Sequence, residues 1–174
     1  MDHLLDSLPA DWAVVCVGEA RATKRPVQWC RESPAGGGPV AGIAAGLEHF
    51  EHFELPDLPD LPEDVDDLEA RICVVVGGDM PFAGPALPAL VEALSAQPGL
   101  DAVLAADPDG RLQPLLAAYR PGVLRAALPR EPGGARLMAV VDALVVGTLD
   151  CEAQITLDVD TPEALERARH IVGA

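Results

Sequence analysis

The clearest structural signal in the chain is found at residues 72–81, Ile-Cys-Val-Val-Val-Gly-Gly-Asp-Met-Pro. The first five residues are apolar and four of them are β-branched, which indicates a strand buried on both faces. Such a strand is typical of the centre of a parallel sheet. We therefore predict a central strand at residues 72–76, with two glycines and Asp79 at its carboxyl end.

On both sides of this strand the sequence alternates between strand and helix patterns. Helices are expected at residues 2–8, 40–50, 85–94, 123–128, 136–146 and from 161 onward, and further strands at residues 13–17, 27–30, 100–106, 112–119 and 154–159. This alternation predicts an α/β fold, a three-layer sandwich around a mostly parallel sheet. A length of 174 residues fits one domain, residues 1–174.

Residues 48–69 differ from the rest of the chain in composition. They hold ten acidic residues, no Lys or Arg, and the near-repeat Leu-Pro-Asp-Leu-Pro-Asp-Leu-Pro at positions 55–62. We interpret this segment as a solvated, acidic, Pro-rich insertion, with a partner-docking segment as the alternative. His49 and His52 at its start are more typical of two exposed imidazoles than of a metal site.

The composition limits the class of partner. The net charge of −16, from 28 acidic and 12 basic residues, does not favour binding to nucleic acid or to an anionic membrane. Small phosphates can still bind locally to backbone N–H groups, a metal ion or arginines. The four cysteines form no Cys-x-x-Cys pair, which argues against a zinc or redox site. With no long apolar run and no basic leader, we expect a cytoplasmic protein without a membrane segment.

Residues that directly follow strands are the candidates for chemistry, because ligands of open α/β sheets bind beyond the carboxyl ends of the strands. Asp79 is one of them, and a carboxylate there is suited to Mg²⁺, which binds one or two carboxylates together with substrate phosphates and water. The alternative is that Asp79 only caps the turn before Pro81.

Two other segments have the same potential. The loop Gly36-Gly37-Gly38-Pro39 precedes a helix and could present N–H groups to an anion or a base, although it matches no established phosphate-binding pattern. Asp158 and Asp160 end the last expected strand, where residues two apart share a face. The alternative is that Asp158 is solvated, and that Asp160 or Thr161 caps the helix beginning at Pro162.

Taken in order, four segments resemble the nucleotidyltransferase domain of the molybdenum cofactor guanylyltransferases. They are Gly38-Pro39-Val40-Ala41-Gly42-Ile43, Val76-Gly77-Gly78-Asp79-Met80-Pro81-Phe82, Gln113-Pro114-Leu115 continuing to Tyr119-Arg120, and the segment from Asp158 to Leu165. The counterparts in that family are Gly-Pro-Leu-Ala-Gly, Cys-Asp-Met-Pro-Phe, Gln-Pro-Leu with a Tyr-Arg pair, and Asn-x-Asn-Thr-Pro-Glu-Asp-Leu. The resemblance implies a Rossmann-like nucleotidyltransferase sheet.

The resemblance also implies a reaction. The family transfers GMP from GTP to the phosphate of molybdopterin, releases pyrophosphate and requires Mg²⁺. By resemblance, Asp79 is the metal ligand, Gly38, Pro39 and Gly42 line the nucleotide pocket, and no protein nucleophile is needed.

Three further positions follow from the same resemblance. Glu32 lies near the acidic residue that contacts the nucleotide in the family. Asp158 and Asp160 replace two asparagines of the family and are expected to bind the nucleotide. These two carboxylates add negative charge beside a polyphosphate, so a metal ion or another cation has to compensate for them.

The resemblance has a gap at the start of the chain. Family members begin with a strand and the loop Leu-Ala-Gly-Gly-x-Ser-x-Arg-Met-Gly-x-Asp-Lys, which holds the triphosphate, and no segment here matches it. Residues 1–8 resemble the helix after that loop. The leading prediction is a Mg²⁺-dependent nucleotidyltransferase acting on GTP and molybdopterin. The alternatives are an inactive nucleotide-binding or partner-docking remnant, a related transferase with another nucleotide or acceptor, and a generic α/β domain. No pattern indicates an oligomeric state.

Overall fold

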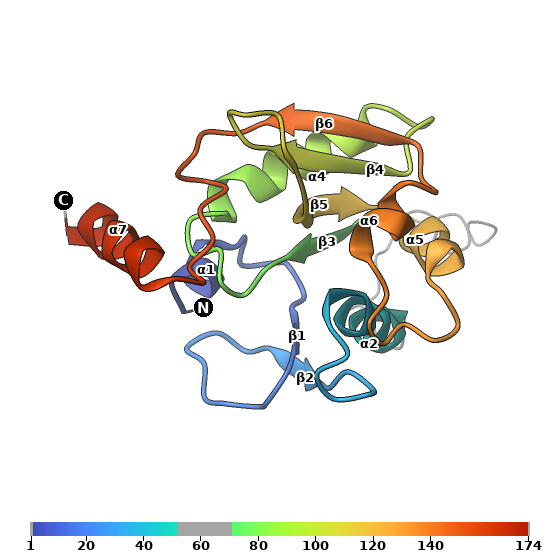
Figure 1. Ribbon diagram of the computed structural model, residues 1–174, viewed down its shortest axis with the longest axis horizontal. Helices are drawn as coiled ribbons and strands as arrows, with labels where there is room; N and C mark the ends of the chain where they lie inside the picture. The colour runs from blue at the N-terminus through green and yellow to red at the C-terminus, as the bar shows by residue number, and fades with distance from the viewer. Residues whose placement is uncertain (1, 52–70, 174) are drawn as a thin grey trace.

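The computed structural model describes residues 2–51 and 71–173, and its centre is a four-stranded mixed sheet (Figure 1). The strand order is β3-β5-β4-β6, with β3 at Cys73–Val76, β4 at Ala102–Ala106, β5 at Leu112–Tyr119 and β6 at Val146–Asp150. β5 is antiparallel to both of its neighbours, whereas β4 and β6 are parallel. Three of the four strands therefore run in one direction, and their carboxyl ends meet at one end of the sheet.

The predicted central strand is real, but its predicted position was wrong. β3 pairs with β5 alone within the four-stranded sheet, so it forms an edge. Both of its faces are nevertheless covered, because Cys73 and Val75 pack against one core cluster while Val74 and Val76 pack against the other. The apolar sequence reports this burial of the two faces. It does not report how many hydrogen-bonded neighbours the strand has.

A second, two-stranded sheet lies beside helix α2. It consists of β1 at Val15–Val17 and β2 at Gln28–Cys30, which run parallel, and α2 spans Pro39–Glu51. A Cβ atom at Gly46 would lie 3.3 Å from the side chain of Val17, so the helix approaches β1 closely. The predicted strands and helix of this unit are confirmed, although β1 is only half-buried.

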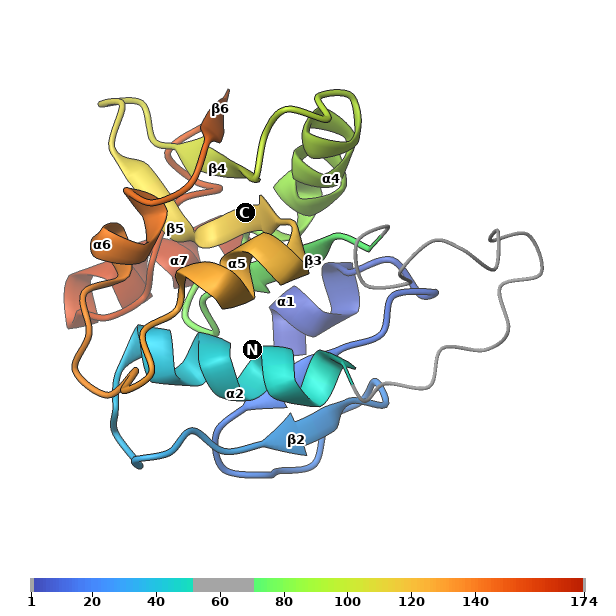
Figure 2. The ribbon, with the colours of Figure 1, turned by 90° about the vertical axis from the view of Figure 1, so that its right-hand side faces the viewer.

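The helices cover both faces of the four-stranded sheet. Their bounds are α1 Asp2–Ser7, the 3₁₀ turn η1 Gly84–Ala86, α4 Leu87–Ser95, α5 Pro121–Ala127, α6 Leu137–Val141 and α7 Pro162–Gly173. Figure 2 shows α4 on one side of the strands and α5 and α6 on the other. Each side has its own core cluster, one including Leu90 and Leu94 of α4, the other Leu124 of α5 and Val141 of α6. The three-layer α/β fold is thus confirmed.

The last third of the chain differs from the prediction. The helix expected at 136–146 ends at Val141, and residues 146–150 form β6 beside β4. The strand expected at 154–159 is instead a series of turns, with Ile155 N donating to Glu152 O and Leu157 N to Gln154 O. The parallel position beside β4 is taken by Val146 and Thr148, which are β-branched and follow the short helix.

Most of the predicted insertion at 48–69 lies outside the described residues, which include only its first four positions at the end of α2. In the described part of the chain, no helix combines the length and the apolar character needed to span a bilayer.

Candidate functional site

The candidate site lies where β3, β4 and β6 end and where β5 begins. Asp79 follows β3 in a tight turn in which Met80 N donates to Gly77 O at 3.1 Å and Gly77 N donates to Leu115 O at 2.8 Å. Met80 is buried and anchors the turn in the core, whereas Asp79 is exposed. The turn therefore presents the carboxylate to solvent at the end of the sheet.

Gly77 is needed to make room for this carboxylate. A Cβ atom at Gly77 would lie 2.6 Å from Oδ1 of Asp79, which is closer than real contacts allow. In the described part of the chain, Asp79 Oδ1 and Oδ2 accept no hydrogen bond from the following turn, so the capping alternative receives no support. The carboxylate of Asp79 is therefore left exposed to solvent.

Asp158 and Asp160 approach Asp79 although they are not on a strand. The backbone N–H of Val159 donates to Asp79 O at 2.9 Å and ties the two loops together. Burial raises the pKa of Asp158, the charges of Asp160 and Asp79 and a hydrogen bond with Asp160 raise it further, and Arg111 opposes them. The three carboxylates therefore form one group, which we call the acidic triad.

The helix cap after the triad resolves an alternative left open by the sequence. Ala164 N donates to Oγ1 of Thr161 at 3.1 Å, so Thr161 caps α7. Asp160 is therefore not needed as the cap, and its carboxylate interacts with Asp158 instead.

On its own, the acidic triad offers only exposed carboxylate oxygens to a metal ion. Within residues 2–51 and 71–173, no three His, Cys, Asp or Glu side chains are arranged to hold a metal ion by themselves. Mg²⁺ does not require such a cage, because it retains water and binds one or two carboxylates plus substrate phosphates. Exposed oxygen ligands of this type match that preference, and Asp79, Asp158 and Asp160 are the residues that would contribute them.

The glycine loop 36–39 forms a second group with Glu32. Gly36 N donates to Oε1 of Glu32 at 3.1 Å, and backbone N–H donors lower the pKa of this carboxyl. Gly134 N donates to Gly37 O at 2.8 Å, which joins the loop to the segment before α6. The N–H of Gly36 is therefore already hydrogen-bonded within the protein, and the Glu32 carboxylate stabilises the glycine loop through this bond.

The remaining loop residues lead into α2. Gly38 has φ +84°, a left-handed conformation that favours glycine, and α2 begins at Pro39. Gly42 faces the two-stranded sheet, because a Cβ atom at Gly42 would lie 3.9 Å from the Val17 side chain in β1. Within the described residues, no hydrogen bond joins this loop to the acidic triad. The sequence-predicted residues thus form two groups, one around the glycine loop and one around Asp79.

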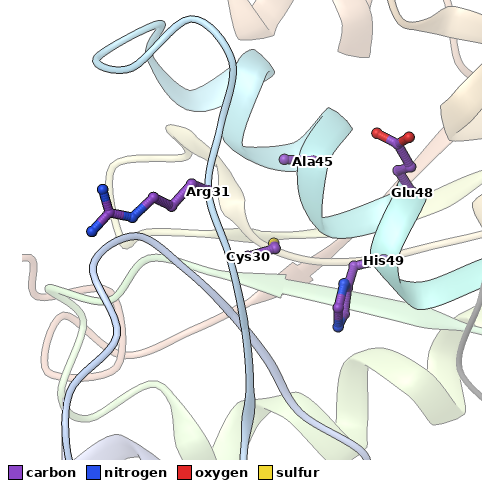
Figure 3. A pocket seen from close by; sticks show the side chains of 5 residues that line it. All are labelled: Cys30, Arg31, Ala45, Glu48 and His49. Atoms are coloured by element: carbon purple, nitrogen blue, oxygen red, sulfur yellow. The ribbon is translucent and has the colours of Figure 1, made fainter.

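A hollow that does not include the acidic triad lies between β2 and α2. It is a cavity of about 290 Å³ lined by Cys30, Arg31, Ala45, Glu48 and His49 (Figure 3). His49 Nε2 forms a hydrogen bond with Oε1 of Gln28 at 2.5 Å. This bond gives the imidazole a structural partner.

Two residues of the third resembling segment have structural roles. The hydroxyl of Tyr119 donates to Pro114 O at 2.7 Å, and burial raises the pKa of this phenol. Nε of Arg120 donates to Leu100 O at 2.8 Å. The Tyr-Arg pair therefore braces the sheet and the loop after α4.

Sequence reasoning did not single out Arg111, whose charge acts on Asp158. The signal that could have found it is Asp107-Pro108-Asp109-Gly110, a turn sequence between two expected strands that directly precedes this arginine.

The mixed sheet with helices on both faces (Figure 2) is of the open α/β class, whose ligands bind beyond the carboxyl ends of the strands. Residues 1–147 match the model of the MobA-like NTP transferase domain, and the chain belongs to this family. The match ends before Asp158, so two of the three residues of the acidic triad, Asp158 and Asp160, lie outside it.

A solved structure has a similar fold. It is the molybdopterin-guanine dinucleotide biosynthesis protein A from Archaeoglobus fulgidus, with 23% identity and a TM-score of 0.58 over 84% of this chain and 69% of that chain. No curated protein sequence matches the chain.

Proposed function

We propose that this protein is a Mg²⁺-dependent nucleotidyltransferase that transfers GMP from GTP to the phosphate of molybdopterin. The observation that carries the proposal is the acidic triad at the end of the sheet, in a chain of the MobA-like NTP transferase family. The similar solved structure is named for molybdopterin-guanine dinucleotide biosynthesis, which supports this choice of nucleotide and acceptor.

In the proposed reaction, a phosphate oxygen of the acceptor attacks the α-phosphorus of GTP. A new P–O bond forms, the bond between the α-phosphorus and the bridging oxygen breaks, and pyrophosphate leaves with the electron pair. Asp79, together with Asp158 or Asp160, would hold Mg²⁺, which would supply positive charge for the phosphate oxygens. The protein's part is to position the substrates, because the acceptor itself is the nucleophile.

The glycine loop is the proposed base-binding element. Gly38 directly precedes α2 and Pro39 begins it, and the positive end of the helix favours an acceptor group of the ligand. Gly42 and Glu32 complete this region, Glu32 by holding the loop through Gly36. A ligand extending from this loop to the acidic triad would place its phosphates near Asp79.

The test is turnover with a matched pair of variants. The chain with GTP, Mg²⁺ and molybdopterin should yield the dinucleotide and pyrophosphate. Asp79→Asn should lower kcat/KM at least about 100-fold, because metal binding supports the whole transition state. Asp109→Asn removes an exposed carboxylate from a nearby turn and should have little effect. Absence of dinucleotide formation, or equal rates for both variants, would contradict the proposal.

Two alternatives remain testable in the same assay. The first is an inactive module of this fold, which would bind GTP without turnover. A related transferase would prefer CTP or another acceptor, and calorimetry with GTP and CTP separates these cases.

We also propose a cytoplasmic location, because all four cysteines are free thiols, as a reducing compartment maintains them.

A further inference from the structure

The turn between β4 and β5 is held rigidly by one aspartate. Oδ1 of Asp107 accepts hydrogen bonds from Asp109 N at 3.0 Å and from Arg111 N at 2.9 Å. Asp107 N donates to Arg111 O at 3.0 Å, and Gly110 N donates to Asp107 O at 2.8 Å. Gly110 has φ +78°, which favours glycine at this position. The backbone of Arg111 is thus fixed on both its N–H and its C=O.

The direction of β5 brings Arg111 to the acidic end of the sheet. Because β5 is antiparallel to its neighbours, it begins where β3 and β4 end. Leu112 pairs with Ala106 at the end of β4, and Leu116 pairs with Val76, three residues before Asp79. Arg111 therefore stands at the same end of the sheet as the triad. Its charge partly offsets the rise in the pKa of Asp158, which agrees with this placement.

The guanidinium of Arg111 is available for a ligand. The side chain is exposed and forms no salt bridge or hydrogen bond with any described residue. Two other arginines are engaged within the protein, since Arg25 donates to Pro9 O at 2.6 Å and Arg120 to Leu100 O at 2.8 Å. Arg111 thus presents a fork of N–H donors that matches two phosphate oxygens.

A substrate phosphate at the triad needs such a group. Asp79, Asp158 and Asp160 repel one another and would also repel a phosphate, and one divalent cation balances only part of this charge. A cation directly before β5 lets the phosphate approach between positive groups.

We propose that Arg111 is a phosphate-binding residue of this site, taking phosphate oxygens of a substrate beside the acidic triad. The inference rests on the proposed function, since it uses the same site. The phosphate is either that of the nucleoside triphosphate or that of the acceptor, and the two are distinguished by the ligand used.

The test is isothermal titration calorimetry on the full chain with three ligands: GTP with Mg²⁺, guanosine, and molybdopterin. Arg111→Gln should weaken binding of the phosphate ligand about 10- to 100-fold, the range of a charge-assisted bidentate contact. Binding of guanosine, which has no phosphate, should not change. Arg111→Lys should restore only part of the affinity, because an ammonium group cannot form the fork. Arg169→Gln removes an equally exposed charge from α7 and is the matched control.

Each outcome decides the question. Loss confined to Mg–GTP assigns Arg111 to the nucleotide, and loss confined to molybdopterin assigns it to the acceptor. Unchanged binding of both phosphate ligands by Arg111→Gln overturns the inference. If the wild type binds Mg–GTP but forms no dinucleotide, the proposed function fails, whereas the loss in Arg111→Gln still supports the phosphate contact. If the wild type binds no phosphate ligand, both are overturned.

Discussion

Replacing Asp107 tests whether one carboxylate organises the β4–β5 turn. In Asp107→Ala, the backbone N–H groups of Asp109 and Arg111 lose their acceptor, which lies at 3.0 and 2.9 Å. The weaker contact from Nε2 of Gln113 to Oδ2 at 3.4 Å is lost as well. The bonds from Asp107 N to Arg111 O and from Gly110 N to Asp107 O involve the backbone alone and remain possible.

The magnitude follows from the number and exposure of these bonds. A hydrogen bond to a charged group contributes about 1.5–3 kcal/mol when it is well shielded. Both bonds in this turn are exposed to solvent, so we expect about half of that for each or less, and about 1–2 kcal/mol in total. For a domain of this size, 1 kcal/mol corresponds to about 2–4 °C in Tm, so the expected fall is about 2–8 °C.

The assay is thermal and urea unfolding of the wild type, Asp107→Ala and Asp107→Asn. The amide oxygen of Asn can still accept both N–H bonds, so this variant should lose less than about 1 kcal/mol. Asp107→Ala should also weaken Mg–GTP binding, because Arg111 is then no longer held in place. Equal stability of Asp107→Ala and the wild type would refute the reasoning, as would Asp107→Asn being as unstable as Asp107→Ala.

Two further predictions concern the two groups of site residues. In Gly37→Ala, the new Cβ atom would lie 2.8 Å from both Ala41 Cβ and Pro34 O, so the free energy of unfolding should fall by about 1–3 kcal/mol in urea titrations. Gly78→Ala, with no atom within 4 Å of its Cβ, should stay within about 0.5 kcal/mol of the wild type, and equal losses would contradict the packing argument. Burial, and after it the neighbouring carboxylates, raise the pKa of Asp158 in the folded protein above its ordinary value of 3.8. As pH rises above 3.8, the unfolded chain therefore loses this proton before the folded protein does. Ionisation of Asp158 then lowers the stability of the fold. Asp158→Asn should therefore lose less stability than the wild type between pH 4 and pH 7, by a few tenths of a kcal/mol because the group is exposed, and a larger loss in the variant would reverse the sign.

Periodicity predicted the elements of the fold better than their order in the sheet. The apolar residues of β3 indicate two covered faces, and Val74 and Val75 do point to opposite core clusters. Burial of a face depends on helices, whereas position in the sheet depends on hydrogen-bonded neighbours. The hydrophobicity of a residue indicates that its face is buried but not how many strands pair with it. The sequence of an edge strand therefore looked like that of a central strand.

The error near the carboxyl end has a different origin. The stretch from Arg136 to Val146 contains apolar residues at helical spacing, but Val145 and Val146 are β-branched and can form either element. The competing position beside β4 decides the outcome, because five pairs from Ala102 with Val146 to Ala106 with Asp150 satisfy an otherwise open edge. A long-range pairing of this kind cannot be read from a local window.

The candidate site was predicted in part, and for one wrong reason. Asp158 and Asp160 were placed together by strand alternation, yet they meet in an irregular loop held by the bond from Val159 N to Asp79 O. Asp79 was singled out from its place after a buried strand, and in the structure it is exposed at the end of that strand. Arg111 was missed because its importance depends on β5 running against its neighbours, which only the assembled sheet shows.

The composition of the acidic triad bears on how the site would select its ligand. Burial, and after it the charges of Asp160 and Asp79, raise the pKa of Asp158, so the three ionised carboxylates repel one another in the free protein. A ligand that brings positive charge relieves this repulsion, so a metal–phosphate complex gains affinity that a free phosphate does not. Asparagines at positions 158 and 160, as in the resembling family, would remove the repulsion and with it this preference. We therefore expect Asp158→Asn to reduce the difference in affinity between Mg–GTP and metal-free GTP. If this difference does not change, the charge of Asp158 does not contribute to the preference for the metal complex.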